Sequence, residues 1–97
     1  MKTRDEILQV LRSQKNSLLE KYQITDLGVF GSYAREQQTE SSDLDILVDY
    51  SQPPTLPKLI ELRDYLSQVF SIKVDVVTQN GLKPRIRERV LSEVIYL

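Results

Sequence analysis

Apolar residues recur at helical spacing near the start of the chain. Ile7, Val10, Leu11, Leu18, Leu19 and Tyr22 fall on one stripe, and Thr3 followed by Glu6 has the form of a capping box. This pattern predicts a helix over residues 3–22 that packs its apolar stripe against a sheet.

The pattern then changes to the alternation that is typical of strands. A short apolar run, residues 27–30, predicts the first strand. Further on, Leu44, Ile46, Val48 and Tyr50 alternate with Asp43, Asp45, Leu47 and Asp49, which predicts a strand with one apolar and one acidic face. Residues 72–78 are rich in β-branched side chains and predict a third strand, which contains Asp75.

Two further helices complete the predicted order. One starts at Thr55 or Pro57 and runs to about Phe70, a basic helix covers roughly residues 82–92, and residues 94–97 fit a small terminal strand. Helices alternating with three or four strands predict a two-layer α/β or α+β domain, with a small mixed sheet and the helices stacked on one face. Residues 1–97 contain no repeat and no boundary, so we expect a single domain.

Gly31 and Ser32 lie where the first strand runs into a short predicted helix that continues to Glu36, with Ser32 as its cap. Backbone N–H groups and the helix dipole converge at such a turn and favour phosphate binding. A Gly-Ser turn is also common as an ordinary serine-capped connection, so the turn alone is a weak indication.

Asp43 and Asp45 open the second strand two residues apart, so their side chains face the same way, about 6–7 Å apart. Such a pair suits one or two Mg²⁺ ions, which prefer hard oxygen ligands and leave sites for phosphate. Asp75 interrupts the most β-prone run, where a carboxylate is costly unless it is solvated or binds a cation. Each acid alone also fits a solvated strand face; together with the Gly-Ser turn they predict a nucleotide site.

The amino-acid composition limits which catalytic groups and binding partners the chain can have. The 97 residues contain no histidine and no cysteine, so acid–base work falls to carboxylates, lysines or tyrosines, and disulfides are excluded. The formal net charge of −1 provides no overall attraction to nucleic acid or to an anionic membrane. Neither an apolar signal segment nor a membrane-spanning run is present, so we expect a cytoplasmic protein.

These residues predict a metal-dependent mechanism. Asp43 and Asp45 would hold Mg²⁺ that bridges a nucleoside triphosphate and neutralises charge on the α-phosphate and the leaving pyrophosphate. Asp75 would hold the metal that binds the attacking hydroxyl, lowering its pKa or accepting its proton. Gly31 and Ser32 would orient the terminal phosphates.

The basic residues leave alternatives open. Arg35, on the short helix, either reaches a phosphate or pairs with Asp26 or Glu40. The basic cluster of the last helix fits a solvated face slightly better than a partner surface or a phosphate contact. That cluster consists of Lys83, Arg85, Arg87 and Arg89.

The combination of Gly31-Ser32, Asp43-x-Asp45 and a later Asp75 resembles the DNA polymerase beta-type nucleotidyltransferase superfamily. The stretches GVFGSYAR, SSDLDILVDY and KVDVVT are most similar to its minimal nucleotidyltransferases, and the resemblance covers nearly the whole chain. It implies the polymerase beta-like nucleotidyltransferase fold, with two Mg²⁺ ions at the three aspartates. It also implies that ATP binds through Gly31 and Ser32, with Arg35 as a further candidate.

Domains of this kind are often antitoxins that transfer AMP from ATP to a tyrosine of a HEPN ribonuclease toxin and silence it. The resemblance therefore implies a protein adenylyltransferase with a HEPN toxin as its partner. An antitoxin acting mainly by stoichiometric complex formation stays open, because Glu36 stands where family members usually have glycine. A glutamate there either caps or solvates the short helix, or weakens triphosphate binding through its charge. Nucleotide transfer to an antibiotic is less favoured, because no second domain forms a cosubstrate pocket. An apolar helix stripe leaves room for a homo- or hetero-oligomer.

Overall fold

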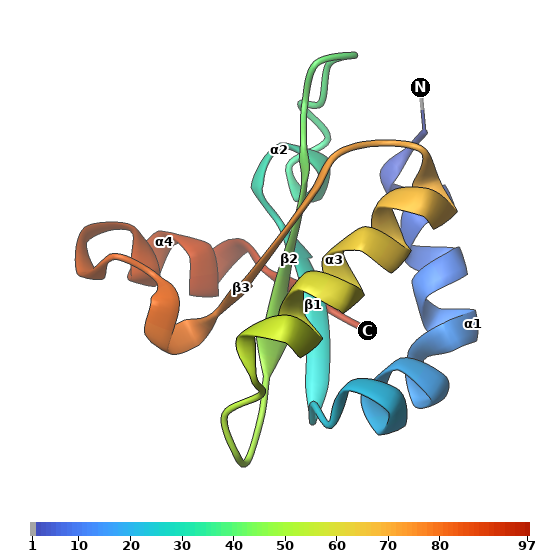
Figure 1. Cartoon of the computed structure of the whole chain (residues 1–97). Helices are drawn as coiled ribbons and strands as arrows, with labels where there is room; N and C mark the ends of the chain where they lie inside the picture. The colour runs from blue at the N-terminus through green and yellow to red at the C-terminus, as the bar shows by residue number, and fades with distance from the viewer. Residues whose placement is uncertain (1) are drawn as a thin grey trace.

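The computed structural model describes residues 2–97, which form helices around a single four-stranded sheet (Figure 1). The elements follow as α1 (Arg4–Tyr22), β1 (Asp26–Phe30), α2 (Gly31–Ala34), β2 (Leu44–Asp49), α3 (Leu56–Phe70), β3 (Val74–Thr78), the 3-10 helix η1 (Gln79–Gly81), α4 (Pro84–Glu93) and β4 (Ile95–Tyr96). The strand order is β3-β2-β1-β4. Strand β1 is antiparallel to both β2 and β4, while β2 and β3 are parallel, so the sheet is mixed, as predicted.

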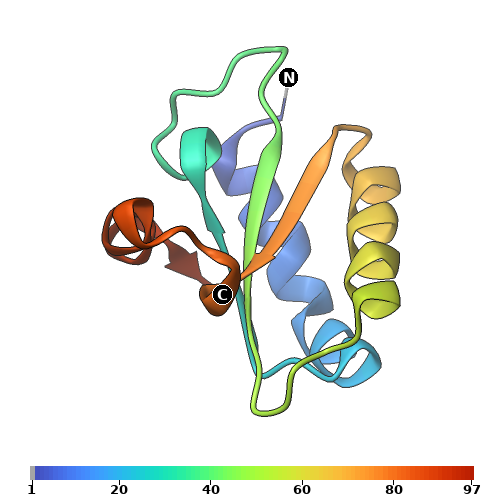
Figure 2. The same cartoon turned by 60° about the vertical axis from the view of Figure 1, so that its left-hand side comes forward.

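Helices α1 and α3 cover one face of the sheet (Figures 1 and 2). Alternate strand residues point into the core between them, and burying each such aliphatic side chain contributes about 1.5–3 kcal/mol. The buried residues include Ile7, Leu11 and Leu18 of α1, Leu27, Val29, Leu44, Ile46 and Val48 of the sheet, and Leu62, Leu66 and Phe70 of α3. Helix α3 also provides the long crossover that parallel strands β2 and β3 require.

The predicted starts of both long helices are confirmed at their caps. Thr3 Oγ1 accepts the N–H of Glu6 at 3.2 Å, and Thr55 Oγ1 accepts the N–H of Lys58 at 3.4 Å. Gly28 in β1 has the role expected of a strand glycine, because a Cβ there would lie 2.9 Å from the carbonyl oxygen of Ile95 in β4. These local features therefore follow directly from residue type.

Helix α4 lies on the opposite face of the sheet, so the prediction that the helices stack on one face is wrong (Figure 1). Leu47 points away from the main core, yet it is fully buried in a second apolar cluster with Leu82 and Val90. The face of β2 expected to be acidic is therefore divided, with Leu47 under α4 and Asp45 at one end. The third strand also starts later than predicted, at Val74.

Several of the predicted site residues lie together at one end of the sheet. Phe30, the last residue of β1, pairs with Asp45 of β2, and Asp45 pairs in turn with Asp75 of β3. The Gly-Ser turn follows Phe30 directly, so it lies beside the aspartates. No helix in the described part of the chain is long and apolar enough to cross a membrane.

Candidate active site

A hollow of about 320 Å³ is bordered by α2, the start of β2 and α4. Its lining contains five residues that the sequence predicts as site residues: Gly31, Ser32, Arg35, Asp43 and Asp45. Helix α4 completes the lining with Ile86, Arg89, Val90 and Glu93, and β1 adds Phe30. The predicted phosphate turn and carboxylate pair thus share one concave surface.

A larger hollow, of about 440 Å³, lies at the other end of β2. Its one carboxylate, Asp49, already accepts hydrogen bonds from Gln79 Nε2 at 3.1 Å and from the Tyr96 hydroxyl at 3.3 Å. No basic residue lines it. The smaller hollow is therefore the better candidate for a phosphate-bearing ligand.

Gly31 and Asp45 fit together in a way that excludes a side chain on Gly31. The Gly31 φ of 75° lies in the left-handed region, and a Cβ at this position would stand 2.1 Å from Asp45 Oδ2. The Asp45 carboxylate therefore rests against the backbone of the Gly-Ser turn. The turn and the Asp45 carboxylate are therefore in direct contact, and there is no room for a side chain between them.

The predicted cap at Ser32 is wrong, because α2 already begins at Gly31 and Phe30 takes the N-cap position without a side-chain bond. The left-handed Gly31 turns the chain from strand into helix within one residue, which puts Ser32 inside the first turn. First-turn N–H groups have no intrahelical acceptor. Since no hydrogen bond within residues 2–97 engages the Ser32 hydroxyl either, both groups stay available to a ligand.

The ionisation of Asp45 is perturbed by its surroundings. Burial, followed by the negative charges of Asp75 and Asp43, raises the pKa of the Asp45 carboxyl from 3.8 to about 6. The positive charge of Arg35 opposes this increase, and Glu93 adds to it. An anionic cluster of this kind would be relieved by a bound cation.

The other two predicted ligands differ in exposure, since Asp43 is half-buried and Asp75 is exposed. Asp43 lies directly before β2, with its Oδ2 3.8 Å from Lys73 Nζ. Asp75 is exposed on the edge strand β3, beside Asp45 in register but outside the lining of the hollow. Across residues 2–97, no three carboxylates converge closely enough to enclose a metal. Asp43 and Asp45 still fit Mg²⁺, which takes one or two carboxylates and completes its shell with water and phosphate oxygens.

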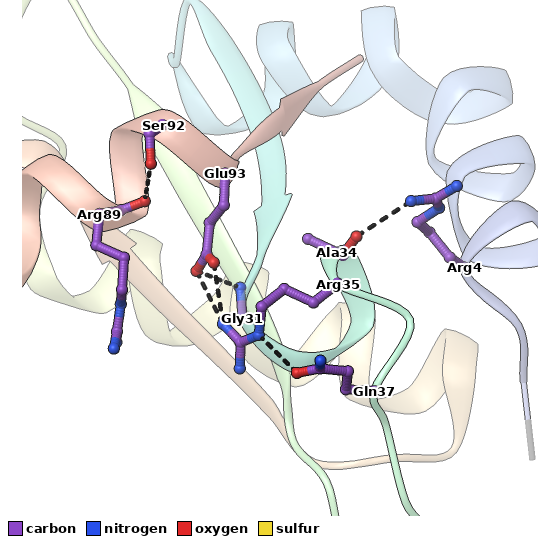
Figure 3. A network of polar contacts seen from close by, with 8 residues as sticks. All are labelled: Arg4, Gly31, Ala34, Arg35, Gln37, Arg89, Ser92 and Glu93. Atoms are coloured by element: carbon purple, nitrogen blue, oxygen red, sulfur yellow. Dashed lines mark hydrogen bonds and ion pairs between the residues drawn. The ribbon is translucent and has the colours of Figure 1, made fainter.

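Arg35 makes neither of the two ion pairs considered from the sequence. Its Nη1 lies 3.1 Å and 3.0 Å from the two carboxylate oxygens of Glu93, the last residue of α4 (Figure 3). The other Glu93 contact is the N–H of Gly31, at 3.2 Å. The predicted pairing of Arg35 with Asp26 or Glu40 is therefore wrong, because α4 brings a closer acid to this point.

The sequence of a known family matches most of the chain. The nucleotidyltransferase domain family aligns with residues 11–97. This chain belongs to that family. A protein adenylyltransferase, MntA, of Thermococcus cleftensis is 43% identical to this nucleotidyltransferase over 97 residues, covering all of this chain and 98% of the relative. A protein of Methanocaldococcus jannaschii, provisionally named a protein adenylyltransferase, is 48% identical over 98 residues, covering the whole of both chains.

Solved structures confirm the fold of the nucleotidyltransferase. A provisionally assigned minimal nucleotidyltransferase superposes with a TM-score of 0.80 at 39% identity, covering 95% of this chain and 94% of the other. A toxin–antitoxin complex with AMP-PNP gives a TM-score of 0.72 at 22% identity, covering 87% of this chain and 69% of that one. The second likeness shows a shared fold. The family and fold that the motifs suggested are thus confirmed.

Glu36 has a local explanation in the nucleotidyltransferase. Its φ of 57° is left-handed, a conformation that glycine adopts without strain, so the backbone here fits the glycine that the family resemblance led us to expect. The Glu36 carboxylate lies 3.3 Å from Arg4 Nη2, and Glu36 does not line the hollow. Its charge is therefore directed toward α1 and away from the hollow.

Two residues of the site carry no motif signal in the sequence. Glu93 belongs to no motif, and Arg89 is one of four basic residues of the last helix, although of the four it alone lines the hollow. The Arg89 guanidinium has no hydrogen bond or ion pair within the described chain. The available signal was helical periodicity, because Ile86, Arg89 and Glu93 recur at i, i+3 and i+7 and so share one face of α4.

Proposed function

We propose that this nucleotidyltransferase transfers AMP from ATP to a hydroxyl group of a partner protein, in a Mg²⁺-dependent reaction. The acceptor is a tyrosine of a HEPN ribonuclease toxin, which the modification silences, so the protein acts as an antitoxin in the cytoplasm. The names of the relatives at 43% and 48% identity support protein adenylylation. The toxin and its tyrosine follow from the family resemblance, and the shared fold of the MntA–HepT complexes is consistent with them.

One observation supports the reaction most directly. The Asp45 carboxylate rests on the Gly-Ser turn, with Asp43 in the same hollow and Asp75 beside Asp45 in register. A site that only binds a protein partner has no need of carboxylates held against a phosphate-binding turn, where burial and mutual repulsion raise the pKa of Asp45.

In the proposed reaction each residue has a defined task. Ser32 donates its N–H and hydroxyl to the terminal phosphates, while the guanidinium groups of Arg35 and Arg89 balance their charge. Asp43 and Asp45 would hold Mg²⁺, which supplies electrostatic stabilisation of the charge that develops on the phosphates. The acceptor oxygen forms a bond to the α-phosphorus as the bond to the β-phosphate oxygen breaks, and pyrophosphate leaves.

Asp75 accepts the proton of the attacking hydroxyl in this proposal. Its exposure on the edge strand β3, beside Asp45 in register, suits that task, because a hydroxyl that approaches the nucleotide from this edge of the sheet meets an exposed carboxylate. With no histidine in the chain, a carboxylate is the natural proton acceptor.

Mass spectrometry of the partner toxin, after incubation with this protein, ATP and Mg²⁺, tests the proposal. We expect one or more AMP groups on a toxin tyrosine, and no transfer by Asp43→Asn or Asp75→Asn. Asp64→Asn is the matched control, because Asp64 is an exposed acid on α3 whose ion pair is with the neighbouring Arg63. Transfer by the two site variants would refute the assignment of the carboxylates.

The binding alternative predicts a different outcome. An unmodified toxin in a stable, inactive complex would indicate neutralisation by stoichiometric binding. Glu36 no longer favours this alternative, because its carboxylate pairs with Arg4 and is directed away from the hollow.

A further inference from the structure

Glu93 connects α4 to the phosphate-binding turn. Its carboxylate accepts the N–H of Gly31 at 3.2 Å, and both of its oxygens lie within 3.1 Å of Arg35 Nη1 (Figure 3). The Glu93 side chain is only 15% exposed, whereas the Arg35 side chain is 40% exposed, so the charge-assisted pair lies at the solvent boundary with its carboxylate on the inner side. One carboxylate thus holds both the start of α2 and the basic side chain that follows α2.

Packing of α4 determines where this carboxylate lies. Val90, one turn before Glu93, is 1% exposed against Leu47 of β2 and Leu82. The N–H of Val94 donates to the carbonyl of Val90 at 2.9 Å and closes the last turn. Packing of α4 therefore fixes the backbone of Glu93 within reach of the Gly-Ser turn.

The guanidinium of Arg35 is held on two sides. Its Nε donates to Gln37 Oε1 at 3.1 Å, and its Nη1 pairs with Glu93. Nη2 has no protein partner among residues 2–97 and points away from both of these contacts (Figure 3). A guanidinium has donors in a rigid plane, so fixing two nitrogens also fixes the direction of the third.

We propose that Glu93 is a positioning residue for the nucleotide polyphosphate. It orients Arg35 so that Nη2 is presented to the phosphates, and it holds Gly31 so that the next N–H and the hydroxyl of Ser32 face the same ligand. This inference rests on the proposed function only in taking a nucleoside triphosphate as the ligand of the hollow. It adds a role for α4, a helix that carries none of the motif residues.

In the alternative role, which we call the plug, the Glu93 carboxylate would occupy the position of a phosphate and would have to leave when nucleotide binds. The geometry disfavours it, because Glu93 contacts one nitrogen of Arg35 and leaves the second terminal nitrogen to a ligand. Expulsion would also break the charge-assisted hydrogen bonds of Glu93 to Gly31 and to Arg35 at the same time.

Calorimetric titration with AMP-PNP and Mg²⁺ tests the inference without requiring catalysis. We expect Glu93→Ala to weaken binding about tenfold, because a charged hydrogen-bond partner that positions the ligand contact is lost. Glu93→Gln keeps an acceptor oxygen for Arg35 and Gly31, so it should recover part of that loss. Glu88→Ala is the matched control on the same helix, since Glu88 is exposed and outside the hollow, and it should bind as the wild type does.

A double-mutant cycle separates positioning from general support of the fold. If Glu93 acts through Arg35, the double variant Arg35→Ala/Glu93→Ala should bind no more weakly than Arg35→Ala. Thermal melts identify a temperature at which every variant is folded.

Each of the following results would overturn the inference. Tighter binding by Glu93→Ala would indicate the plug. Unchanged binding by a folded Glu93→Ala, or fully additive losses in the cycle, would leave Glu93 a purely structural role. Wild-type protein that binds no nucleotide at all would instead refute the proposed function, and the role of Glu93 with it.

Discussion

Replacing Asp45 with asparagine should stabilise the metal-free protein at neutral pH. The folded structure raises the pKa of the Asp45 carboxyl from 3.8 to about 6, chiefly through burial and then through the charges of Asp75 and Asp43. The folded state therefore binds this proton more tightly than the unfolded chain does. The associated stability is complete below about pH 4, and it is lost as the pH rises through about 6. Asparagine has the same shape and no charge to lose.

The magnitude follows from the size of the shift. An increase of about two pKa units corresponds to about 3 kcal/mol if the site were fully shielded from water. Asp45 is only half-buried and solvent screens its interactions, so we expect about 1–2 kcal/mol. For a domain of this size, 1 kcal/mol shifts the melting temperature by roughly 4–8 °C. The variant should therefore melt about 5–10 °C higher at pH 7.5.

Thermal melts of the two proteins in EDTA at pH 4, 5, 6 and 7.5 check this prediction. The difference in melting temperature between the variant and the wild type should be near zero at pH 4 and should increase between pH 4 and 6. Asp64→Asn, an exposed acid outside the hollow, should show no such pH-dependent gap. An equal offset at all four pH values, or a variant less stable than the wild type at pH 7.5, would refute the electrostatic account. Added Mg²⁺ should stabilise the wild type more than the variant.

Three further predictions concern the same region. Gly31→Ala should lower the free energy of unfolding by about 2 kcal/mol in urea melts, because φ is 75° and the new Cβ would meet Asp45. Gly81→Ala, where the nearest atom would lie 3.2 Å from the new Cβ, should lower the free energy of unfolding by less, and an equal loss in the two variants would contradict the proposed clash. Glu36→Gly should change stability by less than about 1 kcal/mol, since relief of the left-handed backbone offsets the lost ion pair with Arg4, and it should leave AMP-PNP affinity unchanged; tighter binding would show that its charge does reach the nucleotide. At subsaturating Mg²⁺ the kcat/KM for AMP transfer should fall below about pH 6 as Asp45 becomes protonated, and saturating Mg²⁺ should move this fall to lower pH; a fall that does not depend on Mg²⁺ would argue against Asp45 as a metal ligand.

Much of the fold was predictable because its signals are local. Thr3 and Thr55 cap helices whether or not the rest of the chain is present, since a cap needs only a hydroxyl three residues before an N–H. The spacing of Asp43 and Asp45 likewise puts two carboxylates on one side of a strand by backbone geometry alone. With the Gly-Ser turn they led to a family that the comparisons confirm.

Other features depend on residues that are distant in sequence. The sequence pattern places Leu47 on the acidic face of its strand, and Leu47 is buried only because α4 packs over that face. Arg35 pairs with an acid 58 positions away, and no local spacing could favour Glu93 over Asp26 or Glu40. The cap expected at Ser32 failed for a related reason, because a left-handed Gly31 starts the helix one residue earlier.

The amino-acid sequence alone predicts the helices and strands, the caps at Thr3 and Thr55, and the carboxylate pair beside a glycine turn, because hydrophobic period and backbone spacing act over a few residues. The position of α4, on the other face of the sheet and at the border of the hollow, follows only from the folded structure. The folded structure also decides that Glu93 reaches Gly31 and Arg35, and that Asp45 lies against Gly31 with a raised pKa. Burial, desolvation and long-range ion pairs depend on which surfaces meet, and those surfaces meet only in the folded chain.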